Sequence, residues 1–392
     1  MSIYYLQMMK IGIVISTLVF IGMYTAISTL SGPTNSVYQG KPPSPRVYKT
    51  EGYYAGFDKT CTAKQTVVFI KTHKTGSQTL ARTIERYGCR HNLTFVRKIN
   101  DKKSIHFANL RFNSKSVHGF LPPPNVTKGD YSNYKYNMLT LHVRYTRKYI
   151  EEFMEDGAKY TTLLRDPSTQ LESAFSFFNI ERLMKNTKSS VSKIEQFLLT
   201  PQKYPKAASH VYVNNDQIFD LGLDNNFFNN ETAINETISN LDEEMDLVLI
   251  NEFFDESLLL LRKLLCWKLE DILYLPMNRR ADYKKTPLSS ALRQKAREKN
   301  HADTLLYDHF VKRLHERIRD YGPSFHVDLM RYRDMMADVR KKCVIGQYVS
   351  GKQILYNQTE NMSKECRIYT EASPESNKRI RQLMKAPTVN YK

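Results

Sequence analysis

The sequence predicts an α/β fold, with a mostly parallel central sheet flanked by helices and an N-terminal helix that crosses a membrane. Three observations support this prediction. Short runs of β-branched and aromatic residues alternate with longer amphipathic segments along the body of the 392-residue chain. A basic turn containing a glycine follows the first of these runs and precedes a helical pattern. Near the N-terminus, residues 11–30 carry no charge.

The uncharged run at residues 11–30 is long enough to cross a hydrocarbon core of ~30 Å as a helix. Lys10 precedes it and the next charge is Lys41, so the positive-inside rule predicts a type II orientation with a cytosolic N-terminus. A cleaved signal peptide is the alternative, although no clear cleavage site is present. The predicted parts are the cytosolic tail 1–10, the signal anchor 11–30, a proline-containing stem 31–62, a lumenal domain 63–349 and a polar tail 350–392.

Two further features favour a lumenal body. Five cysteines in an oxidising compartment leave at least one thiol that is free or pairs between chains. Cys266 lies in an apolar run and is the cysteine that we expect to be a buried thiol. The six Asn-x-Ser/Thr sequons, which we predict to be glycosylation sites, are Asn92, Asn125, Asn230, Asn235, Asn357 and Asn361.

The net charge of the chain limits the classes of partner that we expect it to bind. A formal net charge of +18 favours anionic partners such as a nucleotide, an acidic glycan, a lipid head group or a membrane surface. The spacings of known nucleic-acid modules do not occur, and no histidine or cysteine cluster indicates a metal site. We therefore expect neither a nucleic-acid partner nor a metal.

The elements of the body follow from these patterns in order. Strands are rich in β-branched residues, whereas helices show apolar residues at four-residue spacing, as in the segment that Gly322 and Pro323 end. The predicted strands are 66–70, 137–144 with its end at His142, 159–164 and 246–250. The predicted helices are 77–87 with Ser77 as its cap, 168–185, 255–265 and 301–321, and the core is expected to stop near Gly346.

The basic turn after the first strand predicts an anion site. Gly76 permits close backbone approach, and the N-terminus of the following helix directs N–H groups and positive potential at whatever lies over the turn. Lysine and hydroxyl side chains would complete a pocket for a phosphate or sulfate group. The residues of this turn are Lys71, Thr72, His73, Lys74, Thr75, Gly76, Ser77, Gln78 and Thr79.

A second constellation follows the strand at 159–164. The strand brings Arg165 to its carboxyl end, Pro167 redirects the chain, and Ser173 falls in the next helix. An arginine in this place can bind a phosphate through charge-assisted hydrogen bonds, to which a serine hydroxyl adds one more. The alternative is that Arg165 pairs with Asp166 or with a helix carboxylate and that Ser173 is an ordinary helix residue.

These motifs resemble those of a known family. Lys-x-x-Lys-Thr-Gly-Ser resembles the 5′-phosphosulfate loop of sulfotransferases that use 3′-phosphoadenosine 5′-phosphosulfate (PAPS), and Lys-Thr-His-Lys-Thr-Gly-Ser is similar to the galactose-3-O-sulfotransferase family. Leu-Arg-Asp-Pro with the later Ser-x-Phe resembles the 3′-phosphate segment of sulfotransferases. The likeness continues through residues 219–222, 247–258 and 264–274 and fades after Cys343. It covers most of the lumenal body, whereas stem and tail lie outside it.

The resemblance implies a P-loop-like sulfotransferase fold and a Golgi enzyme. Such an enzyme moves sulfate from PAPS to the 3-hydroxyl of a terminal β-galactoside on a glycolipid or glycan, without a metal. Residues 71–79, Arg165 and Ser173 would then bind the donor, with Lys74 stabilising the leaving phosphate. His142 is the expected base, and it matches a strand-end histidine of the family. His73 is the rival, and the sequence leaves a homodimer open.

Some stretches depart from the family pattern. Residues 92–136 and 214–217 match poorly, which puts the acceptor in doubt. A uronyl or heparan-type 2-O-sulfotransferase and an inactive sulfotransferase-like binding protein therefore stay as alternatives. A nucleotide-sugar glycosyltransferase is disfavoured, because the metal-binding Asp-x-Asp triplet is missing. Four basic residues of a later loop either line an anionic acceptor or cofactor edge or form a solvated basic loop, and the solvated loop is the favoured interpretation; they are Arg279, Arg280, Lys284 and Lys285.

Overall fold

The computed structural model describes residues 61–99, 111–113, 115–184, 191–277, 279–280, 287–351 and 353–385. These residues belong to one compact unit. The predicted cytosolic tail, signal anchor and nearly all of the predicted stem lie outside the described residues. Within the described ranges, no helix combines the length and the apolar character that a membrane crossing requires.

Four parallel strands form the central sheet, in the order β2-β1-β3-β4. They are β1 (Val67–Ile70), β2 (Met138–Leu139), β3 (Lys159–Leu164) and β4 (Leu247–Ile250). Apart from Lys159, every residue of these strands is buried, as expected for a parallel sheet covered on both faces. Because all four strands run in the same direction, their carboxyl ends meet at one edge of the sheet.

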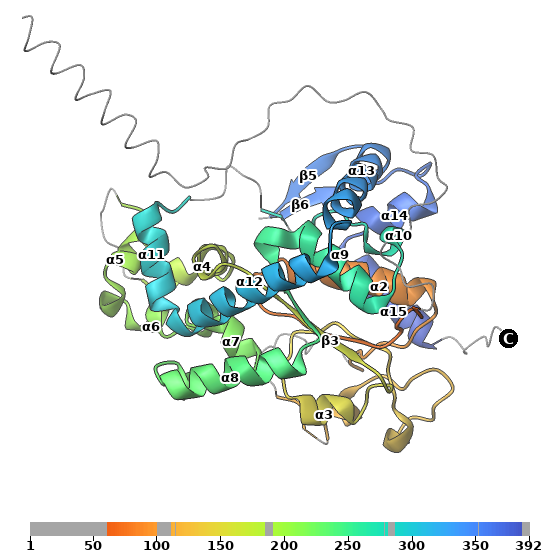
Figure 1. Ribbon diagram of the computed structural model, residues 1–392, viewed down its shortest axis with the longest axis horizontal. Helices are drawn as coiled ribbons and strands as arrows, with labels where there is room; N and C mark the ends of the chain where they lie inside the picture. Colours follow the sequence, from red (N-terminus) through yellow and green to blue (C-terminus); the bar gives the residue numbers. More distant parts are fainter. Residues whose placement is uncertain are drawn as a thin grey trace, which may run out of the picture. The chain divides into compact units, whose positions relative to one another are not determined.

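The main hydrophobic core joins this sheet to the helices around it (Figure 1). Helix α2 (Ser77–Arg90) packs against β2, whereas α9 (Phe254–Leu265) and α12 (His301–Tyr321) pack against β4. Trp267 stacks on Tyr87 of α2, with 3.7 Å between ring centroids. Helix α10 (Leu269–Ile272) bridges α2 and α9, and α13 (Phe325–Cys343) packs on α9.

A second, smaller hydrophobic cluster lies around α4 (Pro167–Phe177). Its buried residues come mainly from α4, α5 (Lys193–Leu199), α6 (Pro205–Ala208) and α11 (Ser290–Lys299), which lie together in Figure 1. Three further α-helices lie between β2 and β4 in the sequence: α3 (Arg147–Glu151), α7 (Asp216–Asp220) and α8 (Glu231–Glu244).

Most predicted elements are confirmed, and the differences have local causes. The strand at 159–164 has the predicted bounds, and β1, β4, α9 and α12 lie within a residue of theirs. The predicted strand 137–144 shrinks to the two residues of β2. Helix α4 ends at Phe177 instead of continuing to 185, because Asn179 takes a left-handed conformation with φ of 53° and a 3₁₀ turn, Ile180–Leu183, follows.

The expectation of a polar tail from residue 350 is wrong for the described part of that segment. Strands β5 (Gln347–Ser350) and β6 (Gln353–Tyr356) form an antiparallel hairpin, followed by α14 (Lys364–Thr370) and α15 (Ser373–Lys385). Tyr369, Ile380 and Met384 are buried in the main core. These helices are short and mostly polar, and only a few apolar side chains on one face of each anchor them.

Two disulfides are present, one between residues 205 apart in the sequence and one between residues 23 apart. Cys61 pairs with Cys266 and Cys343 with Cys366, which leaves Cys89 as a free thiol. The expectation that Cys266 is a buried free thiol is therefore wrong, whereas the expectation of one unpaired cysteine within the chain is confirmed. All six sequon asparagines are exposed, as attachment of a glycan requires.

Candidate active site

A cavity of about 480 Å³ opens at the carboxyl edge of the sheet. Each of the four strands leads into a residue that lines it: β1 into the turn at residues 73–79, β2 into His142, β3 into Arg165 and β4 into Asn251. Carboxyl ends of parallel strands are the usual place for ligands in open α/β sheets. The topology therefore gathers the predicted site residues from widely separated stretches of the chain.

The shape of the turn after β1 depends on Gly76. This residue has φ of +87° and forms the N-cap of α2. The side-chain amide of Asn251 donates to the Thr75 carbonyl at 2.8 Å, and a Cβ added to Gly76 would lie only 2.5 Å from its Nδ2. Ser77 was expected to cap α2, but its hydroxyl instead donates to the Thr72 carbonyl at 2.8 Å. The helix N-terminus faces the cavity and contributes positive potential there.

Most predicted donor-binding residues line the cavity, but three do not. Lys71, Thr72 and Thr75 are buried beneath the turn, outside the cavity lining. The Lys71 ammonium donates to the Gln78 side chain at 2.9 Å, and burial lowers the pKa of Lys71 to about 8. The hydroxyls of Thr72 and Thr75 lie 2.8 Å apart. The predicted site residues that line the cavity are His73, Lys74, Gly76, Ser77, Gln78, Thr79, His142, Arg165 and Ser173.

Lys74 and Arg165 both line the cavity and are joined by a hydrogen bond. The Arg165 guanidinium donates to the Lys74 carbonyl at 3.2 Å and, through Nε, to the Thr169 hydroxyl at 2.9 Å. The Lys74 ammonium lies 3.8 Å from the centre of the Phe177 ring. Among the described residues, the Asp166 carboxylate forms its ion pair with Arg297, at 2.5 Å, and no ion pair between Arg165 and Asp166 is observed. Arg165 is thus held with its charge at the cavity, where Ser173 joins it.

Two histidines stack at the same cavity. The rings of His73 and His142 lie 4.2 Å apart and nearly parallel, at 18°. His142 Nδ1 lies 3.0 Å from the Lys71 carbonyl, which only accepts, so Nδ1 carries the proton and Nε2 holds the lone pair of the neutral ring. Although His142 borders the cavity, the surrounding protein removes enough water to hold its pKa well below the ordinary value, and Lys71 and His73 add to this effect.

Sequence reasoning missed the carboxylates behind His73. Asp220 Oδ2 accepts the backbone N–H of His73 at 2.9 Å and contacts its Nδ1 at 2.7 Å. Asp216 lies beside it and accepts from the Gln170 amide at 2.9 Å, and burial raises the pKa of both carboxyls. The only signal was the segment 219–222, which resembles the family but suggested no role. His73, Asp216 and Asp220 could also hold a metal ion, since their ligand atoms lie within 4.8 Å of one another; the metal-free site stays a prediction.

Comparisons with known proteins identify the family of this chain. The profile of the family described as galactose-3-O-sulfotransferase matches residues 4–370 of the chain. The chain belongs to the galactose-3-O-sulfotransferase family.

Individual relatives of the family support the same assignment. Galactosylceramide sulfotransferase of Mus musculus is 30% identical over 75% of this chain and 68% of its own length. Galactose-3-O-sulfotransferase 3 of Bos taurus is 34% identical over 66% of this chain, but the match spans only 58% of the bovine protein. A sulfotransferase structure from Alicyclobacillus acidocaldarius matches 64% of this chain and 97% of its own, with 13% identity and a TM-score of 0.30, a likeness too low for any argument.

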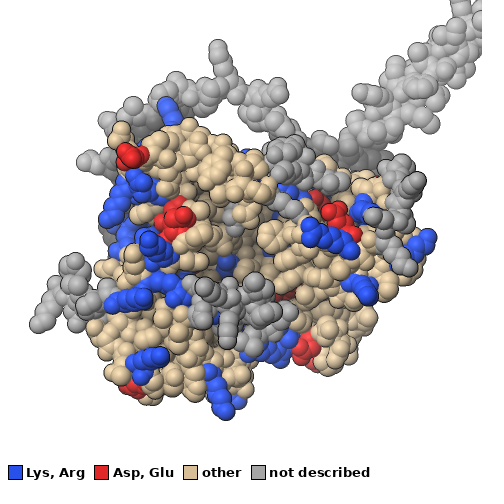
Figure 2. Space-filling view, turned by 180° about the vertical axis from the view of Figure 1, so that it is seen from behind, with Lys and Arg blue, Asp and Glu red and all other residues tan. Residues whose placement is uncertain are grey.

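In this member of the galactose-3-O-sulfotransferase family, two further arginines border the cavity. A solvated loop was the favoured interpretation of Arg279 and Arg280, but both line the cavity, which agrees with the alternative that they border the site. The Arg280 side chain forms an ion pair with Glu172 of α4 at 2.6 Å. The backbone of Arg280 forms an isolated antiparallel β-bridge with Gln353, which also lines the cavity. The segment that was expected to be a tail thus contributes to the site. Figure 2 shows that lysines and arginines also outnumber acidic residues on one face of the surface.

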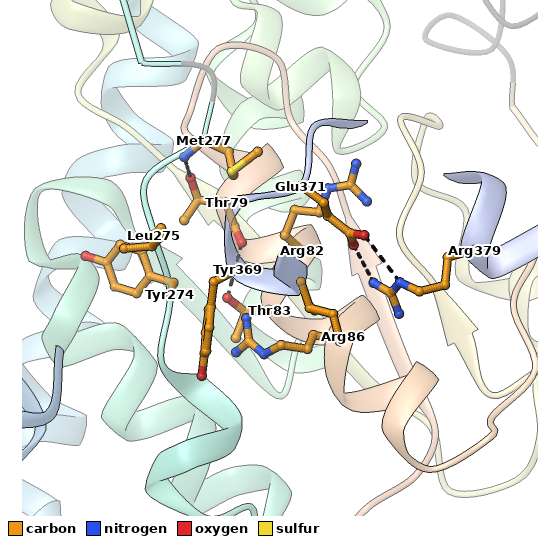
Figure 3. A pocket seen from close by; sticks show the side chains of 11 residues that line it. Thr79, Arg82, Thr83, Arg86, Tyr274, Leu275, Met277, Tyr369, Glu371 and Arg379 are labelled. Carbon is orange, nitrogen blue, oxygen red and sulfur yellow. Dashed lines mark hydrogen bonds and ion pairs between the residues drawn. The ribbon is translucent and has the colours of Figure 1, made fainter. Parts of the chain in front are cut away.

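A much smaller pocket lies between α2 and the C-terminal helices α14 and α15 (Figure 3). Its volume is about 10 Å³, which is room for roughly one water molecule. Arg82 and Arg86 line it, and Glu371 there is paired with Arg379. Thr79 lies on the walls of both cavities. The small pocket is too narrow for a nucleotide or a sugar, so the larger cavity is the candidate active site.

The Gly76 turn yields a stability prediction. Gly76→Ala should lower the free energy of unfolding by about 1–2 kcal/mol for the left-handed backbone and by about 1–3 kcal/mol more for the contact with Asn251. Gly157→Ala is the matched control, because Gly157 has φ of +72° but nothing within 4 Å of an added Cβ. Denaturant unfolding measures both, and equal losses would contradict the role given to the Asn251 contact.

Proposed function

We propose that this chain transfers sulfate from PAPS to the 3-hydroxyl of a terminal β-galactoside of a glycolipid or glycan. One observation carries the proposal. The phosphate-type turn after β1, the Arg165–Ser173 pair after β3 and the stacked histidines all line the same cavity. Family membership indicates the reaction class. The cavity has one cationic region at Lys74 and a second at Arg165, and the candidate base His142 lines the same cavity.

The cavity fits a donor with two anionic ends. PAPS carries a phosphosulfate at the 5′ position and a phosphate at the 3′ position, and a volume of about 480 Å³ falls in the range of small-molecule sites. The N-terminus of α2 with Ser77, Gln78 and Thr79 would hold the phosphosulfate, and Arg165 with Ser173 would hold the 3′-phosphate. The bound donor supplies the sulfuryl group and a bisphosphate leaving group.

The side chains of this site then have distinct roles. His142 Nε2 takes the proton of the acceptor hydroxyl as the new O–S bond forms, while the Lys71 carbonyl keeps the ring in the correct tautomer. The Lys74 ammonium neutralises the charge that develops on the phosphate oxygen as the old S–O bond breaks. Lys71, Thr72 and Thr75 shape the turn from below, without reaching the cavity.

The proposed location is the Golgi membrane, with the catalytic domain in the lumen. The uncharged run at residues 11–30 and the single preceding Lys10 support a type II anchor. Six exposed sequons and two disulfides are compatible with an oxidising, glycosylating compartment.

Transfer itself tests the function. Membranes containing the full chain, incubated with radiolabelled PAPS, should label galactosides or galactosylceramide at the 3-hydroxyl. Lys74→Ala should reduce kcat by about 100-fold or more, because a charge stabiliser of the transition state is lost. Lys203→Ala, an exposed lysine on another element, should change little. Transfer only to uronic-acid glycans would favour a 2-O-sulfotransferase, and donor binding without transfer to any acceptor would favour a binding protein.

Separate histidine variants test the choice of base. His142→Ala should lower kcat by about 10²–10⁴-fold, the usual range for a lost general base, with donor affinity unchanged. His73→Ala should have a smaller effect on kcat, since we assign His73 a supporting position. The assignment is wrong if His142→Ala turns over almost normally while His73→Ala is inactive.

The depressed pKa of His142 predicts a pH profile. A base with a pKa below its ordinary value stays unprotonated, and thus active, when the pH falls through about 6.5. We therefore expect kcat/KM to stay nearly constant between about pH 7.5 and 6.5 and to fall only at lower pH. An acid limb centred at or above pH 6.5 would contradict this environment for the base.

A further inference from the structure

Two aromatic side chains, Phe178 and Tyr212, form what we call the aromatic wall. Phe178 follows the end of α4, and Tyr212 lies in a 3₁₀ turn, Val211–Val213. Their rings stack with 3.7 Å between centroids and an angle of 11°. Both are partly exposed and pack against the second hydrophobic cluster. The buried residues of that cluster therefore support the ring stack.

The aromatic wall adjoins the histidine stack. The Tyr212 ring centroid lies 4.9 Å from that of His73, and the Phe178 centroid lies 6.4 Å from it. Phe178 also lines the large cavity together with His73 and His142. Tyr212 covers one face of the Phe178 ring, and Phe178 lines the cavity on the side of His73, on which the candidate base His142 stacks.

The other lining groups of the cavity are mostly polar or charged, including Lys74, Arg165 and Arg280. These groups suit the anionic ends of the donor, whereas a wall of ring carbons offers them nothing. The ligand beside the histidines must present a hydroxyl to Nε2 and must have an apolar surface of its own. A sugar ring meets both requirements.

We propose that the aromatic wall is the acceptor subsite, against which the apolar face of the acceptor galactose ring packs. In a β-galactopyranoside the axial 4-hydroxyl leaves the C3, C4 and C5 hydrogens together on one face, which carries no hydroxyl. Such a face buries well against an aromatic ring, while the hydroxyls around the ring edge stay available for hydrogen bonds. The inference rests on the proposed galactoside sulfotransferase function.

The adenine base of the donor is the competing occupant of the wall. Proximity to the histidine stack favours the sugar, because the hydroxyl that loses its proton must lie within hydrogen-bond reach of a histidine in that stack. Phe177 is different, since its ring lies under the Lys74 ammonium and is 42% exposed; it is therefore excluded from the wall.

Kinetic constants measured on the full chain in membranes test this inference. Phe178→Ala and Tyr212→Ala should each raise KM for a β-galactoside about tenfold or more, with kcat changed by less than about threefold, as expected when ground-state and transition-state binding are lost equally. The dissociation constant of adenosine 3′,5′-bisphosphate should not change. Tyr212→Phe should keep the wild-type KM, because it keeps the ring. Phe227→Ala, an exposed aromatic outside the cavity, is the matched control.

The outcomes separate this inference from the proposed function. If Phe178→Ala weakens bisphosphate binding and leaves the acceptor KM unchanged, the wall holds the donor base and the inference is wrong, although the function stands. If neither constant changes in either alanine variant, the wall only supports packing and the inference is wrong. If the wild-type chain sulfates no galactoside, the proposed function itself fails. Should Phe178→Ala unfold, Phe178→Leu removes the ring while keeping most of its volume.

Discussion

The contact between Asn251 and the Gly76 turn constrains the whole site. Asn251 follows β4 and the turn follows β1, so their hydrogen bond reaches across the end of β3, which lies between those strands. The Thr72 hydroxyl also bonds the Leu163 carbonyl of β3. These contacts hold the turn against three strand ends, and only a residue without a Cβ fits where Asn251 approaches. The orientation of α2 and the position of Lys74 both depend on this arrangement.

A buried polar network beneath the turn couples the donor side of the site to the base. Glu85 of α2 accepts hydrogen bonds from Arg97 at 2.5 Å, from Arg82 at 3.0 Å and from the Thr140 hydroxyl at 2.8 Å. Burial alone would raise the pKa of Glu85, but the neighbouring guanidinium groups more than offset it and keep the carboxylate charged. Thr140 lies two residues before His142, so the network ties the helix of the turn to the segment that carries the base. Such a network is costly to disrupt, because removing Glu85 would leave the buried guanidinium groups of Arg82 and Arg97 without the carboxylate that they share.

Local patterns were sufficient for some parts of this fold and insufficient for others. The strand at 159–164 and the helix at 301–321 were predictable, because their composition and period reflect burial within a single element. The end of α4 was not, since it depends on one left-handed residue, Asn179. The C-terminal helices were mistaken for a tail because a few apolar residues per helix give a weak signal. The state of Cys266 could not be read either, since its partner Cys61 lies 205 residues away in the sequence.

The sequence by itself determined the family and the strand–turn–helix unit around Lys74 and Gly76. It also identified Arg165, Ser173 and His142 as candidate site residues. Each of these signals lies within a short stretch of chain, so it can be read without the tertiary structure. Only the tertiary structure decided which of these candidates reach a common cavity, that Lys71 lies beneath the turn, and that Asp220 holds His73. It also brought Arg280, Gln353 and Phe178 to the cavity and Tyr212 beside His73. The physical reason is that distances between side chains on different elements are set by how the sheet gathers its strand ends, which no local periodicity encodes.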